Sequence, residues 1–184
     1  MSRVRVGLAL GGGGARGLAH LGVIEALEDH DVPIDVITGT SMGAVIGGAY
    51  ACGVNLSKLE FLLKSRDLHR LLNFPKTSIM RLVGNTASEY ILQNSSWRQE
   101  DAQSTKDAIE FFEIFAQRRC FEDLDFPFAV VAVDVDTGEV INLKSGSISR
   151  AVRAGIDGPG IHYPVKMDER FLVDGGIIRK VPAE

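Results

Sequence analysis

The 184-residue sequence has only two cysteines, and their positions argue against two kinds of stabilisation. Cys52 and Cys120 lie far apart, and neither belongs to a CxxC pair or to a Cys/His set with the spacing of a zinc site. A disulfide framework and a structural zinc centre therefore have no support. We expect both side chains to act as small apolar residues.

The chain also lacks an excess of basic residues and a long apolar run. Its 20 Lys and Arg residues stand against 24 Asp and Glu residues, which gives a formal net charge of -4, and both signs are scattered. This pattern predicts no nucleic-acid partner. No window approaches the roughly 18 apolar residues of a membrane span, and the apolar stretch at the N-terminus is too short for a signal peptide. We therefore expect a cytoplasmic protein.

The order of apolar segments predicts the fold class. A hydrophobic content of 45% suffices for one compact core, so residues 1–184 are expected to form a single domain. Residues 3–10 run into a glycine turn and an amphipathic helix at 17–28, and a β-branched strand at 32–38 leads to a Gly/Ala-rich helix at 42–51. Because parallel strands need such crossovers, we expect an α/β fold with helices flanking a mainly parallel central sheet.

The rest of the chain predicts a helical insertion and further strands. Residues 56–118 have a helical texture and are interpreted as an inserted cap, which either packs on the sheet or forms a lid over a substrate. Residues 126–146 contain two apolar strands around an Asp-Thr-Gly turn, which is typical of a β-hairpin. A short helix at 149–154 and a strand at 170–173 are expected to follow.

Residues 39–43 (GTSMG) form a GxSxG pentapeptide where an apolar strand meets a helix. In this setting the serine occupies a sharp, strained turn that presents its hydroxyl outward, so its neighbours must be small. Ser41 is therefore the candidate nucleophile. The alternative is an ordinary helix N-cap, in which the hydroxyl merely accepts a hydrogen bond from a backbone amide.

Four consecutive glycines, at 11–14, separate the first strand from the first helix. Gly12, Gly14 and Gly17 match the GxGxxG dinucleotide fingerprint, but the second strand does not end in the acidic residue that would bind the ribose. No Gly-Lys-Ser/Thr follows, so a Walker phosphate loop is not supported. The second interpretation is an oxyanion hole, because amides at a helix N-terminus stabilise developing negative charge. Arg16 either adds positive charge there, pins the loop, or is a surface residue.

A nucleophilic serine needs a base, and the sequence offers histidines and one aspartate. His20, His30 and His69 lie in helical or charged segments, which do not place them well. Only His162 lies in a loop near other candidate residues. Asp174 follows an apolar strand, so we expect it at the carboxyl end of the sheet, where ligands bind in open α/β folds. Partial burial would raise the pKa of Asp174 and suit it as the base. The alternative is that Asp174-Gly175 simply forms a turn after the strand.

Three segments, GGGGARG (11–17), GTSMG (39–43) and DGG (174–176), resemble in order and spacing the motifs of the patatin-like phospholipase family. The resemblance extends over essentially the whole chain, including residues 121–139 and 151–165. It implies a patatin-like three-layer fold and a Ser-Asp dyad without histidine. It further implies hydrolysis of lipid carboxylic esters through an acyl-enzyme, with no metal and no cofactor.

The resemblance also assigns roles by matching position. Ser41 corresponds to the nucleophile and Asp174 to the base. The oxyanion loop corresponds to Gly11, Gly12, Gly13 and Gly14, with Arg16 beside it. The implied partner is a lipid or fatty-acyl ester, reached through transient contact with a membrane surface. An apolar groove for it would be formed by side chains that otherwise belong to the core, namely Met42, Leu62, Leu63, Phe111, Phe112 and Phe115.

Two features depart from the family pattern. The family usually continues after DGG with another core strand, whereas this sequence reaches Glu184 soon afterwards. We therefore expect a sheet that is incomplete at the C-terminus, with an exposed edge that favours a homo-oligomer. Asp157 adds a carboxylate near the expected site, where it either competes with Asp174 or is solvated.

Three other functions stay open from the residues alone. An esterase of the α/β-hydrolase type would use Ser41, Asp134 and His162. A nucleotide-binding module would use the GxGxxG glycines and leave Ser41 structural. A catalytically inactive homologue would act through contacts between copies.

Overall fold

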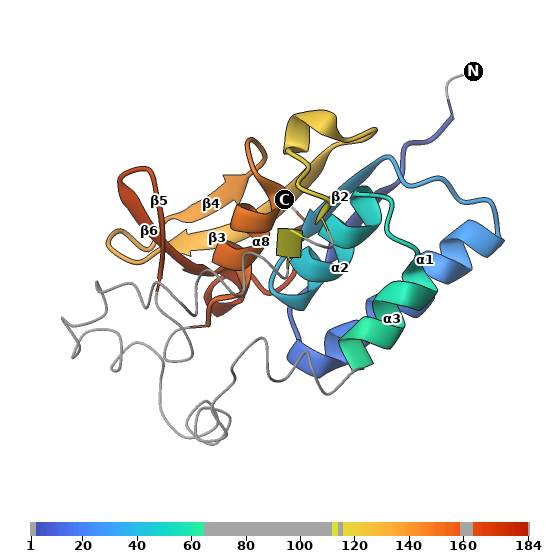
Figure 1. The fold of residues 1–184 in the computed structure, drawn as a ribbon, viewed down its shortest axis with the longest axis horizontal. Coiled ribbons are helices and arrows are strands. Elements are labelled where there is room, and N and C mark those ends of the chain that lie inside the picture. The colour runs from blue at the N-terminus through green and yellow to red at the C-terminus, as the bar shows by residue number, and fades with distance from the viewer. Residues whose placement is uncertain (1–2, 65–111, 114–115, 159–163, 184) are drawn as a thin grey trace.

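The computed structural model describes residues 3–64, 112–113, 116–158 and 164–183 (Figure 1). The strands in this part of the chain are β1 (Gly7–Leu10), β2 (Val36–Gly39), β3 (Phe128–Asp134), β4 (Val140–Leu143), β5 (Val165–Met167) and β6 (Arg170–Asp174). The α-helices are α1 (Ala19–Asp29), α2 (Met42–Ala51), α3 (Leu56–Lys64) and α8 (Ile148–Ile156). Three 3-10 helices are also described: η1 (Gly14–Leu18), η3 (Phe121–Asp123) and η4 (Gly175–Ile177).

These strands form one sheet with a parallel centre. β1, β2 and β3 pair in parallel, β4 and β6 both pair antiparallel with β3, and β5 pairs antiparallel with β6. The predicted α/β fold is thus confirmed, as is the predicted hairpin, which consists of β3 and β4. The short strand β5 has no counterpart among the elements that the sequence pattern predicts.

Two different strands, β2 and β6, pair with the same edge of β3. Just before β3, the carbonyl of Pro127 accepts a hydrogen bond of 3.0 Å from the amide of Ile37 in β2. Just after β3, the amide of Val135 donates a hydrogen bond of 2.8 Å to the carbonyl of Phe171 in β6. Alternate residues of a strand direct their peptide groups to the same edge, and both contacts fall on odd-numbered positions. β2 and β6 therefore follow one another along the same edge of β3.

The two strands meet there with their carboxyl ends facing each other. β2 ends with Gly39 opposite Val130, and β6, which runs the other way, ends with Asp174 opposite Ala132. The ends are two β3 residues apart, which is about 7 Å of strand. A side chain that directly follows β2 is thereby brought close to the last residue of β6.

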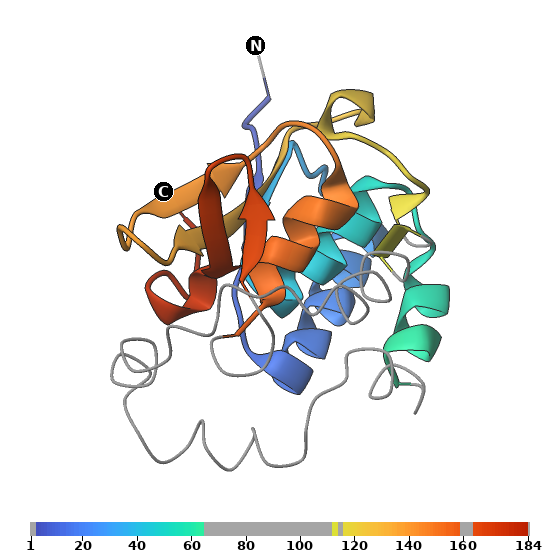
Figure 2. The ribbon, with the colours of Figure 1, turned by 60° about the vertical axis from the view of Figure 1, so that its left-hand side comes forward.

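α2 and α8 pack side by side against the sheet (Figure 1 and Figure 2). α2 contacts β2 and β3, α8 contacts β3 and β6, and both α1 and α3 pack on α2. Because α2 is enclosed between the sheet and other helices, all of its residues except Met42 and Tyr50 are buried. This position explains why the helix is built almost entirely from Gly, Ala and aliphatic residues.

Two of the predicted groove residues belong to the core between the sheet and these helices. Leu63 and Phe112 are only 6% and 3% exposed and belong to the main apolar cluster, so they do not line an open groove. Met42 is partly buried against the same cluster. Phe111, Phe115 and the side chain of Leu62 lie outside the described residues.

Most of the predicted insertion at 56–118 also lies outside the described residues, so its role as a cap stays a prediction. In the part of the chain that the structure does describe, no helix is both long enough and apolar enough to cross a membrane.

Candidate active site

Ser41 occupies the sharp turn that leads from β2 into α2. Its backbone has φ 55° and ψ -127°, a strained conformation that costs about 1–3 kcal/mol. The turn needs a small neighbour, because a Cβ on Gly43 would clash with the carbonyl of Leu10. The hydroxyl of Ser41 makes no N-cap hydrogen bond to α2. The alternative of an ordinary capping serine is therefore wrong, and the hydroxyl is directed elsewhere.

The hydroxyl of Ser41 approaches the side chain of Asp174 closely enough to favour the charged form of its carboxyl group. This approach follows from the fold, because Ser41 comes directly after β2, Asp174 ends β6, and the two strands meet on the same edge of β3. The amide of Gly176 also donates to Oδ1 of Asp174, at 2.7 Å, which fixes the carboxylate. Ser41 and Asp174, the two side chains selected from the sequence, therefore lie close together.

Asp174 lies in an environment that strengthens it as a base. Burial raises the pKa of its carboxyl group above the ordinary value of 3.8, because desolvation disfavours the charged form. The hydrogen bond from Gly176 and the nearby hydroxyl of Ser41 lower this pKa but do not cancel the effect of burial. A carboxylate with a raised pKa accepts a proton more readily than an aspartate in water.

The glycine loop lies beside Ser41 and offers two main-chain donors. A Cβ on Gly12 would lie 3.1 Å from the Cβ of Ser41. The amide of Gly12, however, already donates to the carbonyl of Lys180 at 2.8 Å. Within the described residues, the amides of Gly13 and Gly14 donate to no other group. Of the loop amides that follow Gly11, only that of Gly12 is thus bonded within the described residues.

The other two loop residues named by the sequence analysis have different positions. The carbonyl of Gly11 is hydrogen-bonded to Nε2 of His20 at 2.8 Å, which ties the loop to α1. Arg16 is exposed, and its Cβ would lie 3.7 Å from a Cβ on Gly13. Arg16 therefore lies at the rim of the loop.

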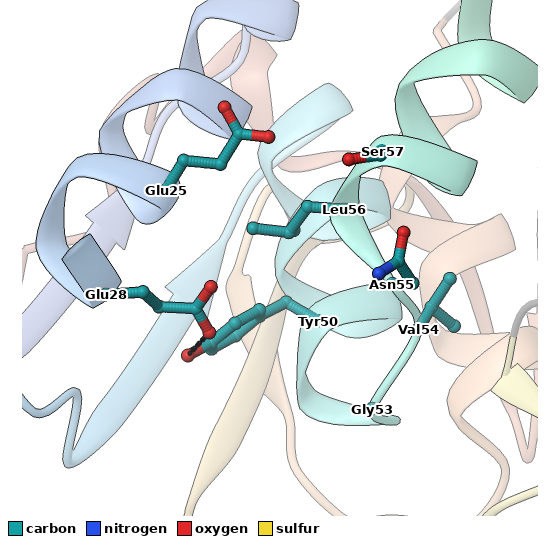
Figure 3. A pocket seen from close by; sticks show the side chains of 8 residues that line it. All are labelled: Glu25, Glu28, Tyr50, Gly53, Val54, Asn55, Leu56 and Ser57. Atoms are coloured by element: carbon teal, nitrogen blue, oxygen red, sulfur yellow. Dashed lines mark hydrogen bonds between the residues drawn. The ribbon is translucent and has the colours of Figure 1, made fainter.

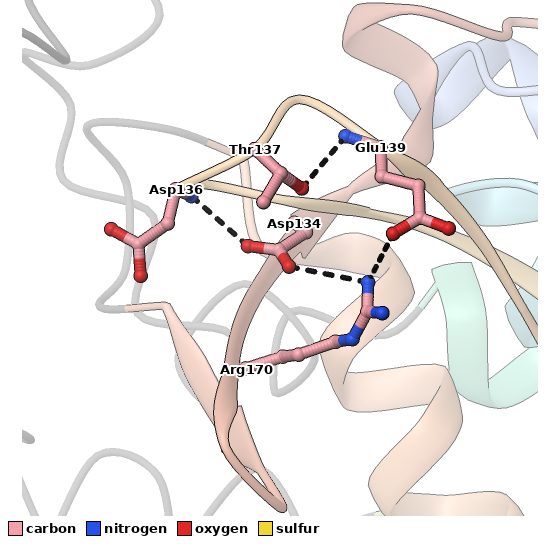
Figure 4. Close-up of polar contacts among 5 residues, drawn as sticks. All are labelled: Asp134, Asp136, Thr137, Glu139 and Arg170. Carbon is pink, nitrogen blue, oxygen red and sulfur yellow. Dashed lines mark hydrogen bonds and ion pairs between the residues drawn. The ribbon is translucent and has the colours of Figure 1, made fainter.

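Asp134, the acid of the α/β-hydrolase alternative, accepts hydrogen bonds at the turn between β3 and β4 (Figure 4). Its buried carboxylate accepts hydrogen bonds from the amide of Asp136 at 3.0 Å and from Arg170 at 3.3 Å. Arg170 also pairs with Glu139 at 2.5 Å, so this cluster fixes the β3–β4 turn to β6. His162, the base of that alternative, lies outside the described residues.

Asp157 is neither solvated nor available to Ser41. It is 0% exposed, and its carboxylate forms an ion pair with Arg153, which is 1% exposed. The alternative of a solvated carboxylate is therefore wrong. The sequence analysis did not single out Arg153, although the opposite charges four residues apart at a helix end were a signal for the pair.

The described residues supply neither a metal site nor a complete dinucleotide site. Among them, no group of three or more His, Cys, Asp or Glu side chains is arranged to hold a metal ion. For a dinucleotide, the amide of Gly12 is already bonded to Lys180, and β2 ends in Gly39 rather than in an acidic residue that could bind ribose.

A hollow of about 410 Å³ lies at the opposite end of α2 from Ser41 (Figure 3). It is lined by Glu25, Glu28, Tyr50, Gly53, Val54, Asn55, Leu56 and Ser57. The hydroxyl of Tyr50 donates to Glu28 across it at 3.0 Å. Tyr50 and Ser41 are separated by nearly the whole helix, which is about 14 Å, so the hollow is distinct from the Ser41 site.

Comparison with known proteins identifies the family. A family model described as patatin-like phospholipase matches residues 8–184. The chain belongs to the patatin-like phospholipase family. The resemblance that the three sequence motifs indicate is thereby confirmed.

Relatives agree with this membership of the patatin-like phospholipase family. An uncharacterized NTE family protein of Mycobacterium bovis is 36% identical over 181 residues, which are 98% of this chain and 45% of that protein. Patatin-like phospholipase domain-containing protein 6 of Mus musculus is 30% identical over 97% of this chain and 12% of that protein. The chain thus spans less than half the length of these curated relatives.

The crystal structure of VipD from Legionella pneumophila superimposes with a TM-score of 0.66, over 100% of this chain and 48% of that one. At 16% identity, this likeness supports the patatin-like fold alone.

Proposed function

We propose that this patatin-like chain is a serine acyl hydrolase that cleaves carboxylic esters of lipids with Ser41 as nucleophile and Asp174 as base. The observation that carries the proposal is the close approach of these side chains, with Ser41 at a strained strand-to-helix turn. Family membership supports the lipid substrate class, because the matching model describes phospholipases.

In the proposed reaction, Asp174 accepts the proton of the Ser41 hydroxyl as the oxygen attacks the ester carbonyl. The tetrahedral intermediate collapses to an acyl-enzyme, and the departing alcohol takes the proton back from Asp174, which is thereby ionised again. Water then attacks the acyl-enzyme with Asp174 again as base, and the fatty acid leaves. The raised pKa of Asp174 suits both proton transfers.

The amides of Gly13 and Gly14 are proposed to bind the oxyanion of both intermediates. Donors that are already fixed in place stabilise charge that develops in the transition state, and removing one costs on the order of 10²–10³ in kcat. Gly11 and Gly12 hold the loop through His20 and Lys180, and Arg16 adds positive charge at its rim. Transient contact with a membrane surface and a cytoplasmic location are part of the same proposal.

Labelling with a fluorophosphonate probe tests this function. The probe reacts with an activated serine, so we expect the wild-type protein to be labelled and to hydrolyse a short-chain ester, and Ser41→Ala to do neither. Absence of labelling in a folded wild-type protein would instead support an inactive homologue. Saturable binding of NAD or FAD without labelling would support the nucleotide-binding alternative.

A further inference from the structure

One short segment at the C-terminal end of α8 holds the backbone of both proposed catalytic residues. The amide of Ser41 donates a hydrogen bond of 3.1 Å to the carbonyl of Gly155. The amide of Asp174 donates a hydrogen bond of 2.9 Å to the carbonyl of Asp157. Because the two carbonyls are two residues apart on one turn, the conformation of that turn fixes the separation of Ser41 and Asp174.

The same turn carries a buried ion pair between Arg153 and Asp157. Both side chains are almost fully enclosed, with exposed fractions of 1% and 0%, and they are four residues apart on α8. Burial lowers the pKa of Arg153 to about 10, so its guanidinium group is still charged at neutral pH. Arg153 also lies in the last turn of α8, where a cation interacts favourably with the helix dipole.

Close packing holds the same turn against the sheet. A Cβ on Gly155 would lie only 2.5 Å from Cγ1 of Val130 in β3, so α8 approaches the strand as closely as glycine allows. This approach brings the carbonyl of Gly155 within reach of the Ser41 amide. The turn is thus fixed on one side by β3 and on the other by the ion pair.

We propose that the Arg153–Asp157 pair is a positioning device for the Ser41–Asp174 dyad, an inference that rests on the proposed function. A buried ion pair is seldom the most stable solution for a core, because desolvation offsets much of the attraction. Its value here lies in its geometry: it sets the conformation of the turn whose carbonyls align the nucleophile with its base. Arg153 and Asp157 touch neither the substrate nor the reacting atoms and act only through this turn.

Two variants separate positioning from general stability. Asp157→Asn keeps the size of the side chain and removes the charge partner, whereas Arg153→Lys keeps the charge and removes the planar geometry of the pair. The readouts are kcat and KM for a water-soluble short-chain ester, the rate of fluorophosphonate labelling, and Tm. Arg170→Lys is the matched control, because it perturbs another ion pair with a buried aspartate, Asp134, away from Ser41.

We expect Asp157→Asn to lower kcat and the labelling rate by about tenfold or more, since misplacing reacting groups by about 1 Å has effects of this size or larger. KM should stay within about twofold, because ground-state binding is untouched. Arg153→Lys should fold, and its kcat and labelling rate should lie between those of the wild type and those of Asp157→Asn. Arg170→Lys should change Tm and leave kcat as in the wild type.

Wild-type kcat in folded Asp157→Asn would overturn the inference and leave the proposed function intact. Should Asp157→Asn not fold, wild-type kcat in Arg153→Lys would overturn it in the same way. A wild-type protein that neither hydrolyses the ester nor reacts with the probe would overturn the proposed function, and this inference with it.

Discussion

The amide of Gly12 and the carbonyl of Lys180 are joined by a hydrogen bond of 2.8 Å, so the segment after β6 holds the glycine loop beside Ser41. The same segment is anchored a second time, because the hydroxyl of Thr38 in β2 donates to the carbonyl of Pro182 at 2.5 Å. The loop proposed to bind the oxyanion therefore depends on residues near the end of the chain.

Deleting residues 178–184 should therefore impair catalysis more than folding. Without the Gly12–Lys180 bond, the amides of Gly13 and Gly14 lose their fixed direction, and we expect kcat to fall on the order of 10²-fold. Thr38→Val should cause a smaller fall in kcat, and Thr38→Ser, which keeps the hydroxyl, should cause none. Steady-state kinetics together with circular dichroism measure both effects. Full activity in the shortened protein would show that the loop does not need this support.

Replacing Ser41 by glycine should stabilise the protein relative to replacing it by alanine. The φ of 55° strains any residue that has a Cβ, and glycine relieves that strain. We expect Ser41→Gly to exceed Ser41→Ala by about 1 kcal/mol in free energy of unfolding, measured by urea denaturation. Both variants lack the hydroxyl, so activity does not complicate the comparison. Equal stabilities would mean that the turn relaxes when the serine is removed.

The stability of the protein should depend on the protonation of Asp174. Burial raises its pKa in the folded state above 3.8, so the folded protein binds this proton more tightly than the unfolded chain does. This contribution to stability is complete below that unfolded value and is lost as the pH rises through the folded pKa. The Asp174→Asn variant has no carboxyl group at this position, so it does not lose stability in this way as the pH rises. We expect its Tm to exceed that of the wild type near about pH 8 and the difference to shrink toward about pH 4. A constant difference in Tm across this range would contradict the raised pKa.

Asp35 should show the opposite dependence on pH. The hydrogen bond from Arg3, followed by that from the amide of Val6, lowers the pKa of Asp35 from 3.8 to about 2. The stability that this carboxylate contributes is present above its unfolded pKa and is lost as the pH falls toward the folded value. Asp35→Asn should therefore lower Tm at neutral pH, and this effect should disappear as the pH falls through about 2. A series of melting curves for the two proteins tests this, and an unchanged Tm at neutral pH would contradict it.

Local patterns were sufficient to predict most elements and the identity of the Ser41 and Asp174 pair. The GxSxG pentapeptide predicts a strained serine because only small neighbours fit around the turn, and Ser41 has the expected positive φ. The glycines after Asp174 mark the end of its strand, and β6 ends there. Strand β5 could not be predicted in the same way, because three residues are too few to show a period.

The reason that Ser41 and Asp174 lie close together could not be read from the sequence. Their proximity depends on β6 running antiparallel to β3 on the edge that β2 also uses, and strand direction and edge are set by long-range pairing rather than by local pattern. The burial of Asp157 could not be predicted from the sequence for a similar reason. Opposite charges four residues apart usually mark the exposed face of a helix, and only the packing of α8 on the sheet encloses this pair.

In the proposed mechanism an aspartate, without a histidine, activates Ser41. Its most direct test compares Asp174→Asn with His162→Ala on the same soluble ester, with Tm as the control for folding. We expect Asp174→Asn to lower kcat by roughly 10²-fold or more, which is the usual contribution of a general base, and His162→Ala to stay within about twofold of the wild type. A folded Asp174→Asn variant with wild-type kcat, beside an inactive His162→Ala, would contradict it.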